Sequence, residues 1–416
     1  MLISPDKSEA VIRIREMNQR RLARPAPSRF HSYWPLKPGI VFLNHGSFGA
    51  CPKRILELQN RLRAAMEAEP VQFLWRRYEE YLEPSRVSVA RFVGARPKDL
   101  AFVTNATTGV NAVLRSIELR RGDELLTTNQ DYNACRNVLI EAAARTRAKV
   151  VVAQVPFPLT KPEQVLDAIL RRVSGRTRLA MIDHVTSSTA LVFPVARIVQ
   201  ELEARGVDTL VDGAHAPGMV PVNIARLNPA YYTANLHKWV CAPKGAAFLW
   251  VRGDKQQKMQ PAIVSHGNNT PRPGYSAFQD RFDWAGTLDP TPWFCAGAAI
   301  DWMGKVMPGG WSAIREANHI LAVNARKLLC DRLQVEAPCP EAMLGSMATI
   351  SLPDQFQGKP KTSKIDPEQC RLYDEFGIEV PFFRMGHPER RWFRISAQLY
   401  NSLSEYEYLG SALCVL

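Results

Sequence analysis

The sequence predicts an α/β protein: a large domain with a mostly parallel central sheet flanked by helices, followed by a smaller α+β C-terminal domain. The main observation is that, from about residue 85, short apolar runs alternate with segments of helical period. A second observation is that this alternation changes near residue 290, where two longer helical segments begin. We therefore expect an N-terminal arm over residues 1–40, the large domain over 41–305 and the small domain over 306–416.

Each element of the large domain follows from this alternation. The helical segments have apolar residues at helical spacing, and those that start at residues 84 and 195 end at a glycine, which is typical of a helix C-terminus. The predicted helices span residues 84–95, 106–117, 133–146, 162–173 and 195–206. The predicted strands span residues 100–104, 123–128, 148–155, 178–185 and 208–214.

The ends of the chain differ from this pattern. Residues 1–35 read as a polar helix followed by a Pro-containing arm, which either lies on a partner subunit or is a loose end. The C-terminal part is predicted to contain helices at 292–306, 311–333 and 366–376, strands at 347–353, 378–383 and 391–397, and a loop at 353–365.

The composition is that of an ordinary globular protein, with 46% hydrophobic and 22% charged residues among 416. The net charge is +13, but Lys and Arg are scattered and their densest clusters are short, so we expect no nucleic-acid partner. The eight cysteines are dispersed without a CxxC or zinc-type pairing, which predicts no metal site and a cytoplasmic, reducing setting. No apolar run reaches transmembrane length, so we expect a soluble protein and no membrane partner.

Two charged residues stand where sites form in parallel sheets, at the carboxyl ends of strands. Asp212 ends the strand "DTLVD", and Lys238 follows 26 residues later in the apolar stretch "NLHKWVCAPKG". From the local residues alone, Lys238 is as consistent with a snorkelling lysine at a strand end as with a functional one. Together with Asp212, its non-functional interpretation is a buried ion pair. The functional interpretation is a pyridoxal phosphate site, in which an enclosed lysine forms an imine and an ionised aspartate keeps the pyridine nitrogen protonated.

A third segment supplies a place for the phosphate. "TNATTGVNAV" (104–113) runs from a strand through small hydroxyl residues into a helix, and backbone N–H groups at a helix N-terminus favour an anion. By itself this stretch is an ordinary N-cap at Asn105 or Thr107. Next to Asp212 and Lys238 it favours a phosphate cradle.

Together these residues resemble the class V aminotransferase family of fold-type I pyridoxal phosphate enzymes, and are most similar to its isopenicillin N epimerase-like branch. The resemblance extends from "FLNHGSFGACP" (42–52) to "FRISAQLYNSLSEY" (393–406). It implies roles for single residues. Lys238 matches the Schiff-base lysine and Asp212 the partner of the pyridine nitrogen. His215 matches a group bonded to the phenolic oxygen of the cofactor, with a satisfied core histidine as the alternative.

The resemblance also assigns the surroundings of the cofactor. Tyr132 matches the aromatic residue that stacks on the ring, where many relatives have histidine. The residues matched to the phosphate site are Ala106, Thr107, Thr108, Asn235 and His237. "WAGTLD" (284–289) matches an element that reaches the neighbouring subunit's phosphate, so the resemblance implies a homodimer with Thr287 acting in trans.

On the substrate side, Arg394 matches the arginine that binds the substrate carboxylate, for which a bidentate guanidinium is suited. A surface or ion-paired arginine is the alternative. Asn44, His45 and Ser47 lie where the family's N-terminal segment closes over the substrate, and His45 is a candidate second acid or base.

The implied activity is that of a PLP-dependent enzyme acting at Cα of an amino acid through an external aldimine, as an epimerase does. A carbon–sulfur β-lyase acting on a cysteine conjugate is the alternative, and a non-catalytic scaffold protein with this fold is the third hypothesis. The loop "EVPFFRMGHPERRWFRIS" (379–396) has no cysteine, so a persulfide-forming desulfurase is not expected.

Overall fold

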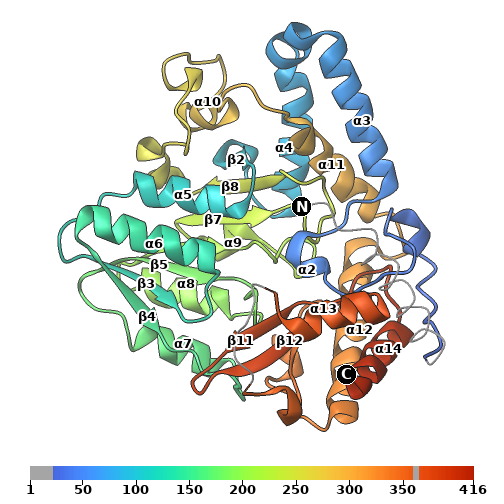
Figure 1. Ribbon diagram of the computed structural model, residues 1–416. Coiled ribbons are helices and arrows are strands. Elements are labelled where there is room, and N and C mark those ends of the chain that lie inside the picture. The colour runs from blue at the N-terminus through green and yellow to red at the C-terminus, as the bar shows by residue number, and fades with distance from the viewer. Residues whose placement is uncertain (1–21, 359–364) are drawn as a thin grey trace.

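The computed structural model describes residues 22–358 and 365–416. Its centre is a sheet of seven strands in the order β2-β8-β7-β6-β5-β3-β4, and the strands from β7 to β4 run parallel (Figure 1). Only β8 among these seven runs antiparallel to its two neighbours. The strands are β2 (Leu100–Val103), β3 (Glu124–Thr128), β4 (Lys149–Ala153), β5 (Thr177–Asp183), β6 (Asp208–Asp212), β7 (Tyr231–Asn235) and β8 (Ala247–Val251). The predicted mostly parallel sheet is confirmed.

Helices cover both faces of this sheet because successive side chains on a strand point to opposite sides. On β7, Tyr231 packs with the cluster beneath α5, α6 and α10, whereas Tyr232 packs with the cluster beneath α4 and α11. The first group is α5 (Ala106–Ser116), α6 (Asn133–Thr146) and α10 (Ala277–Asp283). The other helices of this part are α2 (His45–Phe48), α3 (Lys53–Ala68), α4 (Tyr78–Phe92), α7 (Glu163–Leu170), α8 (Val195–Glu203), α9 (Ile224–Leu227) and α11 (Thr291–Met303).

The C-terminal part forms a second, smaller layer, at the lower right in Figure 1. Its antiparallel sheet has the order β11-β12-β9 and is covered by α12. Its elements are α12 (Gly310–Leu333), β9 (Met347–Ser351), α13 (Pro367–Phe376), β10 (Ile378–Glu379), β11 (Phe382–Met385), β12 (Arg390–Ser396) and α14 (Leu403–Val415). The predicted small α+β domain is confirmed, with the single strand expected at 378–383 divided into β10 and β11.

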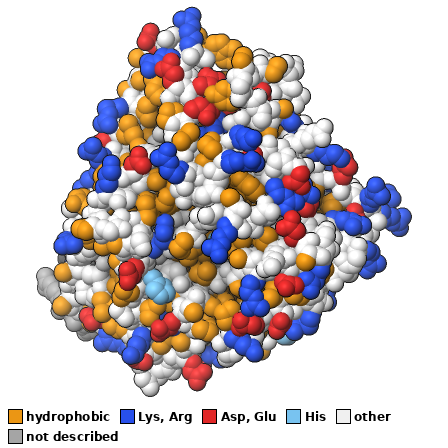
Figure 2. All heavy atoms as spheres, turned by 180° about the vertical axis from the view of Figure 1, so that it is seen from behind, with side chains coloured by type: hydrophobic (Ala, Val, Ile, Leu, Met, Phe, Trp, Pro, Cys, Tyr) orange, Lys and Arg blue, Asp and Glu red, His pale blue; other side chains and the backbone are white. Residues whose placement is uncertain are grey.

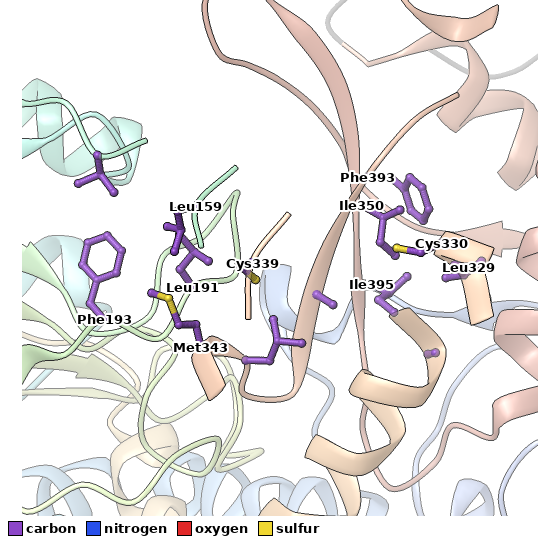
Figure 3. Packing of buried hydrophobic residues seen from close by; sticks show 14 of the residues in the cluster. Leu159, Leu191, Phe193, Leu329, Cys330, Cys339, Met343, Ile350, Phe393 and Ile395 are labelled. Atoms are coloured by element: carbon purple, nitrogen blue, oxygen red, sulfur yellow. The ribbon is translucent and has the colours of Figure 1, made fainter. Parts of the chain in front are cut away.

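One hydrophobic cluster joins the two parts. Leu191 and Phe193 come from the large domain, and Ile350, Phe393 and Ile395 come from the strands of the small sheet (Figure 3). All five side chains are almost completely buried. Because this cluster is continuous and includes Ile182 of β5, it fixes the small sheet against the large domain near the carboxyl end of β5, where the candidate site lies.

The N-terminal arm is attached to its own chain in the part that the structure describes. Ser28 N donates to Tyr400 O at 3.3 Å, Ser402 Oγ donates to Ala26 O at 2.6 Å, and Trp34 is buried against Tyr400. Residues 22–34 are therefore not a loose end. The polar helix predicted within residues 1–21 lies outside the described residues. After the arm, β1 (Val41–Phe42) pairs in parallel with β10.

The surface carries charges of both signs. On the face seen from behind, Lys and Arg side chains are scattered with Asp and Glu among them, and no single-sign patch dominates that face (Figure 2). None of the helices within residues 22–358 and 365–416 is both long and apolar enough to cross a membrane. Nor do the side chains described there form a metal-binding cluster of His, Cys, Asp and Glu.

Candidate active site

The carboxyl ends of β5, β6 and β7 and the N-terminus of α5 open onto one cavity of about 850 Å³. Parallel strands bring their carboxyl ends to the same edge, which is why residues far apart in sequence meet here. The cavity is lined by Ser47, Phe48, Thr104, Asn105, Ala106, Thr107, Thr108, Asn111, Tyr132, Asp183, Val185, Ser187, Asp212, Ala214, His215, Asn235, His237, Lys238, Lys244 and Gly245. Ten of the fourteen residues singled out from the sequence are among them.

Lys238 is partly buried at the cavity, and its amine meets His215. The distance from Lys238 Nζ to His215 Nε2 is 3.0 Å, and the Trp239 indole N–H donates to His215 Nδ1 at 3.4 Å. An indole nitrogen can only donate, so His215 Nδ1 is the acceptor and the neutral ring carries its proton on Nε2. His215 Nε2 therefore donates to Lys238, which accepts as a neutral amine. Burial, with the charge of Arg394 second, lowers the pKa of Lys238 to about 7.

Asp212 ends β6 and faces the same cavity. Its Oδ1 accepts from Ala214 N at 2.9 Å and its Oδ2 accepts from the Cys135 thiol at 3.3 Å. Burial raises the pKa of Asp212, and these two donors oppose that increase. The carboxylate is thus held by donors without a cation within ion-pair distance in the described chain, which suits it to a protonated ring nitrogen.

The N-terminus of α5 forms the predicted anion end of the cavity. Ala106 N donates to Asn235 Oδ1 at 2.9 Å, and Thr108 N donates to Asn105 Oδ1 at 2.8 Å. Two of the three expected amides are thus already bonded, whereas Thr107 N has no acceptor among the described residues. The anion would therefore meet Thr107 N, the threonine hydroxyls and the Asn235 amide.

His237 lies at the same end. Its Nδ1 donates to Ala246 O at 3.1 Å, which leaves Nε2 for the cavity. Burial lowers the pKa of His237 to about 4, so the ring is neutral without an anion beside it. A phosphate dianion would oppose that effect, because a neighbouring negative charge favours the protonated ring.

Arg394 on β12 lies behind the cavity wall. Its guanidinium donates to Ser187 O at 2.6 Å, to Ser47 Oγ at 3.2 Å and to Asn44 Oδ1 at 3.3 Å. Its Nε is buried without a partner, and none of the described carboxylates lies within ion-pair distance of it. Burial lowers the pKa of Arg394 to about 10. A buried guanidinium without a carboxylate is suited to receive one from a substrate.

His45 does not lie on the cavity, so its predicted role as a second acid or base is not supported. The ring is fully buried, with Nδ1 at 2.9 Å from Tyr400 Oη and Nε2 at 3.0 Å from Lys238 O. Burial lowers the pKa of His45 to about 3. The neighbouring "HGSFG" stretch packs this closely because Gly49 has φ of 70° and a Cβ there would lie 2.1 Å from His237 O. His45 thus supports the backbone of Lys238.

The remaining predicted residues divide into two groups. Ser47 and the half-exposed Tyr132 line the cavity, whereas Asn44 lies behind it, where its Oδ1 accepts from Ser47 Oγ at 2.5 Å and from Arg394 at 3.3 Å. Thr287 is exposed and lies away from the cavity of its own chain.

Sequence reasoning missed three residues here. Asp183 ends β5 as Asp212 ends β6, and this shared strand-end position was a readable signal. Cys135 and Ser187 carried no such signal, because the thiol acts through its contact with Asp212 and Ser187 through its backbone carbonyl.

These residues fit pyridoxal phosphate. The cavity offers the Lys238 amine with its lowered pKa, the Asp212 carboxylate with its two donors, and the free Thr107 amide at the N-terminus of α5. Behind the cavity wall, Arg394 Nε has no hydrogen-bond partner among the described residues and could bind an anion. Each group of the cofactor finds a residue of matching chemistry.

Comparison with known proteins agrees with this fit. Residues 53–365 match the aminotransferase class-V family. This chain belongs to the class V aminotransferase family. Among curated relatives, an isopenicillin N epimerase of Streptomyces clavuligerus is 33% identical over 92% of this chain and 96% of its own. A putative L-cysteine desulfhydrase of Oryza sativa subsp. japonica is 30% identical over 90% of this chain and 83% of its own.

Solved structures of the same fold type support the architecture of this class V protein. The cysteine desulfurase CsdA of Escherichia coli has a TM-score of 0.75 at 19% identity, covering 93% of this chain and 97% of its own. The structure of a C-DES mutant with glycine covalently linked to the PLP cofactor also has a TM-score of 0.75 at 19% identity, covering 94% of this chain and 99% of its own. At this identity the likeness concerns the fold.

Proposed function

We propose that this protein is a PLP-dependent enzyme that removes the Cα proton of an amino-acid substrate. The observation that carries the proposal is the contact of the Lys238 amine with His215 in a cavity that also holds Asp212, where burial lowers the pKa of Lys238 to about 7. A neutral amine is a base, whereas an exposed lysine at neutral pH is a cation. Bound PLP would supply an electron sink, because its protonated pyridine ring would draw electrons away from Cα of the substrate.

The chain's own residues divide the remaining work. Asp212 keeps the ring nitrogen protonated, and the amides and hydroxyls at the start of α5 hold the phosphate. Arg394 receives the substrate carboxylate at the wall formed by Ser47 and Ser187. The carboxylate then fixes Cα within reach of Lys238, which takes the proton.

The finer proposal is epimerisation, in which a second acid returns a proton to the opposite side of Cα. With His45 withdrawn from the cavity, Tyr132 is the candidate, because it lines the cavity from the start of α6 and is half exposed. The similarity to isopenicillin N epimerases over nearly the whole chain supports this reaction.

A second candidate is β-elimination from a cysteine-like substrate. It is favoured by the position of His45, since elimination needs no second acid at Cα and Lys238 alone suffices. The L-cysteine desulfhydrase relatives support it as well.

One experiment separates the two reactions. The purified protein with PLP is incubated in D₂O with a panel of L-amino acids, including cysteine and S-alkyl cysteines. Formation of the D-isomer with deuterium at Cα, and no loss of total amino acid, indicates epimerisation. Release of pyruvate with a thiol or sulfide indicates β-elimination. Lys238→Ala is the inactive control. Tyr132→Phe removes D-isomer formation if Tyr132 is the second acid but leaves β-elimination intact. Neither exchange nor pyruvate with any amino acid would contradict the proposal.

We further propose a homodimer in which Thr287 reaches the partner's site. Thr287 is exposed and away from its own cavity, and the apolar side chains of Phe48, Trp75 and Ile263 are each at least 60% exposed, which is typical of an interface. A cytoplasmic location stays a prediction.

A further inference from the structure

The unexplained feature of the cavity is a second buried carboxyl group, Asp183. It ends β5, and in the parallel pairing of β5 with β6 its Cα is the direct partner of Asp212. Neighbouring strands lie about 4.8 Å apart, so in-register residues carry their side chains side by side. Both residues line the cavity and both are at least 95% buried.

The alternation of side chains places both carboxyl groups on the same face of the sheet. Met181 on β5 and Leu210 on β6 belong to the cluster beneath α5 and α6, and Asp183 and Asp212 follow each of them by two residues. Cys135, which donates to Asp212, comes from α6 on that face. His184, the residue after Asp183, points to the opposite face of the sheet, where its Nδ1 lies 2.9 Å from Tyr232 Oη.

The two carboxyl groups differ in their donors. Asp212 accepts from a backbone amide and a thiol, whereas Asp183 Oδ2 is buried with no hydrogen-bond partner among the described residues. Two adjacent carboxyl groups in a dry site do not both ionise, and the group with more donors keeps the charge.

From this geometry we propose that Asp183 is a positioning residue that stays a neutral carboxylic acid and keeps Asp212 as the ionised member of the pair. A neutral Asp183 then offers an O–H donor beside the Asp212 carboxylate, which has no cation within ion-pair distance among the described residues. The inference goes beyond the proposed function, because it holds whichever reaction follows removal of the Cα proton.

The other charged and titratable groups around Asp183 agree with this assignment. Burial and then the charge of Asp212 raise the pKa of Asp183 well above its usual range, with Asp131 adding to the increase. Lys238 and Arg136 oppose it. Lys238 contacts His215 and has a lowered pKa, and Arg136 is paired with Asp131, so neither forms an ion pair with Asp183.

The protonation state is measured by isotope-edited infrared spectroscopy on protein labelled with ¹³C-aspartate, with and without PLP at pH 7.5. We expect a protonated carboxyl C=O band in the wild type that disappears in Asp183→Asn. If the Asn variant does not fold, Asp183→Thr replaces it: threonine keeps a neutral donor but has no carboxyl group, so the band should disappear there as well. A wild type without a protonated carboxyl band would overturn the proposal, and so would a band that persists in the folded variants.

A second readout is the pH dependence of the visible band of the cofactor bound to Lys238. Replacing a neutral acid by a neutral amide moves its midpoint by less than about 0.3 pH unit, whereas loss of a charge in Asp212→Asn moves it by about one unit or more. A shift in Asp183→Asn as large as that in Asp212→Asn would show that Asp183 is ionised and refute the inference.

Asp183→Val, which has no donor, should lower the rate of Cα exchange at least about tenfold, with Asp183→Thr close to wild type. Equal rates in the Val and Thr variants would contradict the positioning role.

Discussion

Lys238 shows how the surroundings of a lysine lower its pKa. It is partly buried beside the charge of Arg394, it accepts from the neutral His215 ring, and its backbone carbonyl is bonded to His45. Each of these contacts disfavours a charged amine or fixes the position of a neutral one. The reactivity of Lys238 therefore depends on residues from α2, from the turn after β6 and from β12, which converge only in the folded chain.

This leads to a prediction for the capture of PLP by the apoprotein. Only a neutral amine attacks the cofactor aldehyde, and burial lowers the pKa of Lys238 to about 7 from an ordinary value of 10.5. Because the pKa is lowered, the reactive form dominates above pH 7 and is lost as the pH falls through 7. Stopped-flow absorbance should show a capture rate that rises to a plateau with a midpoint near pH 7. A rate still rising at pH 9.5 would show that Lys238 is an ordinary lysine.

Arg394 allows a second prediction at this scale. Its guanidinium is buried and pairs with none of the described carboxylates, and its proposed role is to bind the carboxylate of a substrate. Arg394→Lys loses the bidentate geometry, and we expect kcat/KM for the amino-acid substrate to fall about 100-fold while PLP affinity and the thermal midpoint change little. Arg390→Lys, at a half-exposed ion pair, is the matched control. If Arg394→Lys instead lowers PLP affinity and the thermal midpoint along with kcat/KM, Arg394 has a structural role.

At the scale of elements, the phosphate cradle depends on how closely α5 approaches β7. Gly109 lies in α5, and a Cβ added there would lie 2.2 Å from Thr233 Oγ1 on β7. The same two elements are joined at their ends by Ala106 N and Asn235 Oδ1. The glycine thus sets the position of the amides that are proposed to bind the phosphate.

Gly109→Ala should therefore weaken PLP binding. Alanine favours a helix over glycine by about 1 kcal/mol, but a contact of 2.2 Å forces α5 outward at a cost of about 1–3 kcal/mol, so the clash dominates. We expect a roughly tenfold weaker PLP affinity by equilibrium titration and a lower thermal midpoint. Gly175→Ala is the control, since nothing lies within 4 Å of a Cβ there. An unchanged PLP affinity in Gly109→Ala would show that phosphate binding does not depend on the close packing of α5 against β7.

The elements also show what the sequence predicts and what it does not. Asp212, the start of α5 and the alternating helices and strands were predictable, because each depends on periodicity or on the rule that sites lie at carboxyl ends of strands. The antiparallel β8 and the long α3 were not predicted. Neither was the pairing of β1 with β10, because it joins Val41 to Ile378 and no local pattern encodes so distant a contact. For the same reason the sequence suggested His45 as an acid or base, whereas distant Tyr400 and Lys238 occupy both its ring nitrogens.

At the scale of the whole molecule, the open question is whether one chain holds a complete site. The cavity of the described chain contains the lysine, the aspartate and the α5 cradle, but Thr287 lies outside it on an exposed turn. If the protein forms the proposed homodimer, a Thr287 hydroxyl from the partner would complete the phosphate site. Each site would then combine two chains.

Mixed dimers of two inactive variants test this arrangement. We expect Lys238→Ala to be inactive and Thr287→Val to bind PLP about tenfold more weakly, as fits the loss of one hydrogen bond to a charged group. In a heterodimer, the site built on the Thr287→Val chain keeps its own Lys238 and receives an intact Thr287 from the Lys238→Ala chain. Refolding the two variants together and titrating PLP should therefore restore wild-type affinity at one site per dimer. If Thr287 serves its own chain, that site stays defective and no mixture recovers the affinity, while a monomer in sedimentation velocity would rule out shared sites altogether.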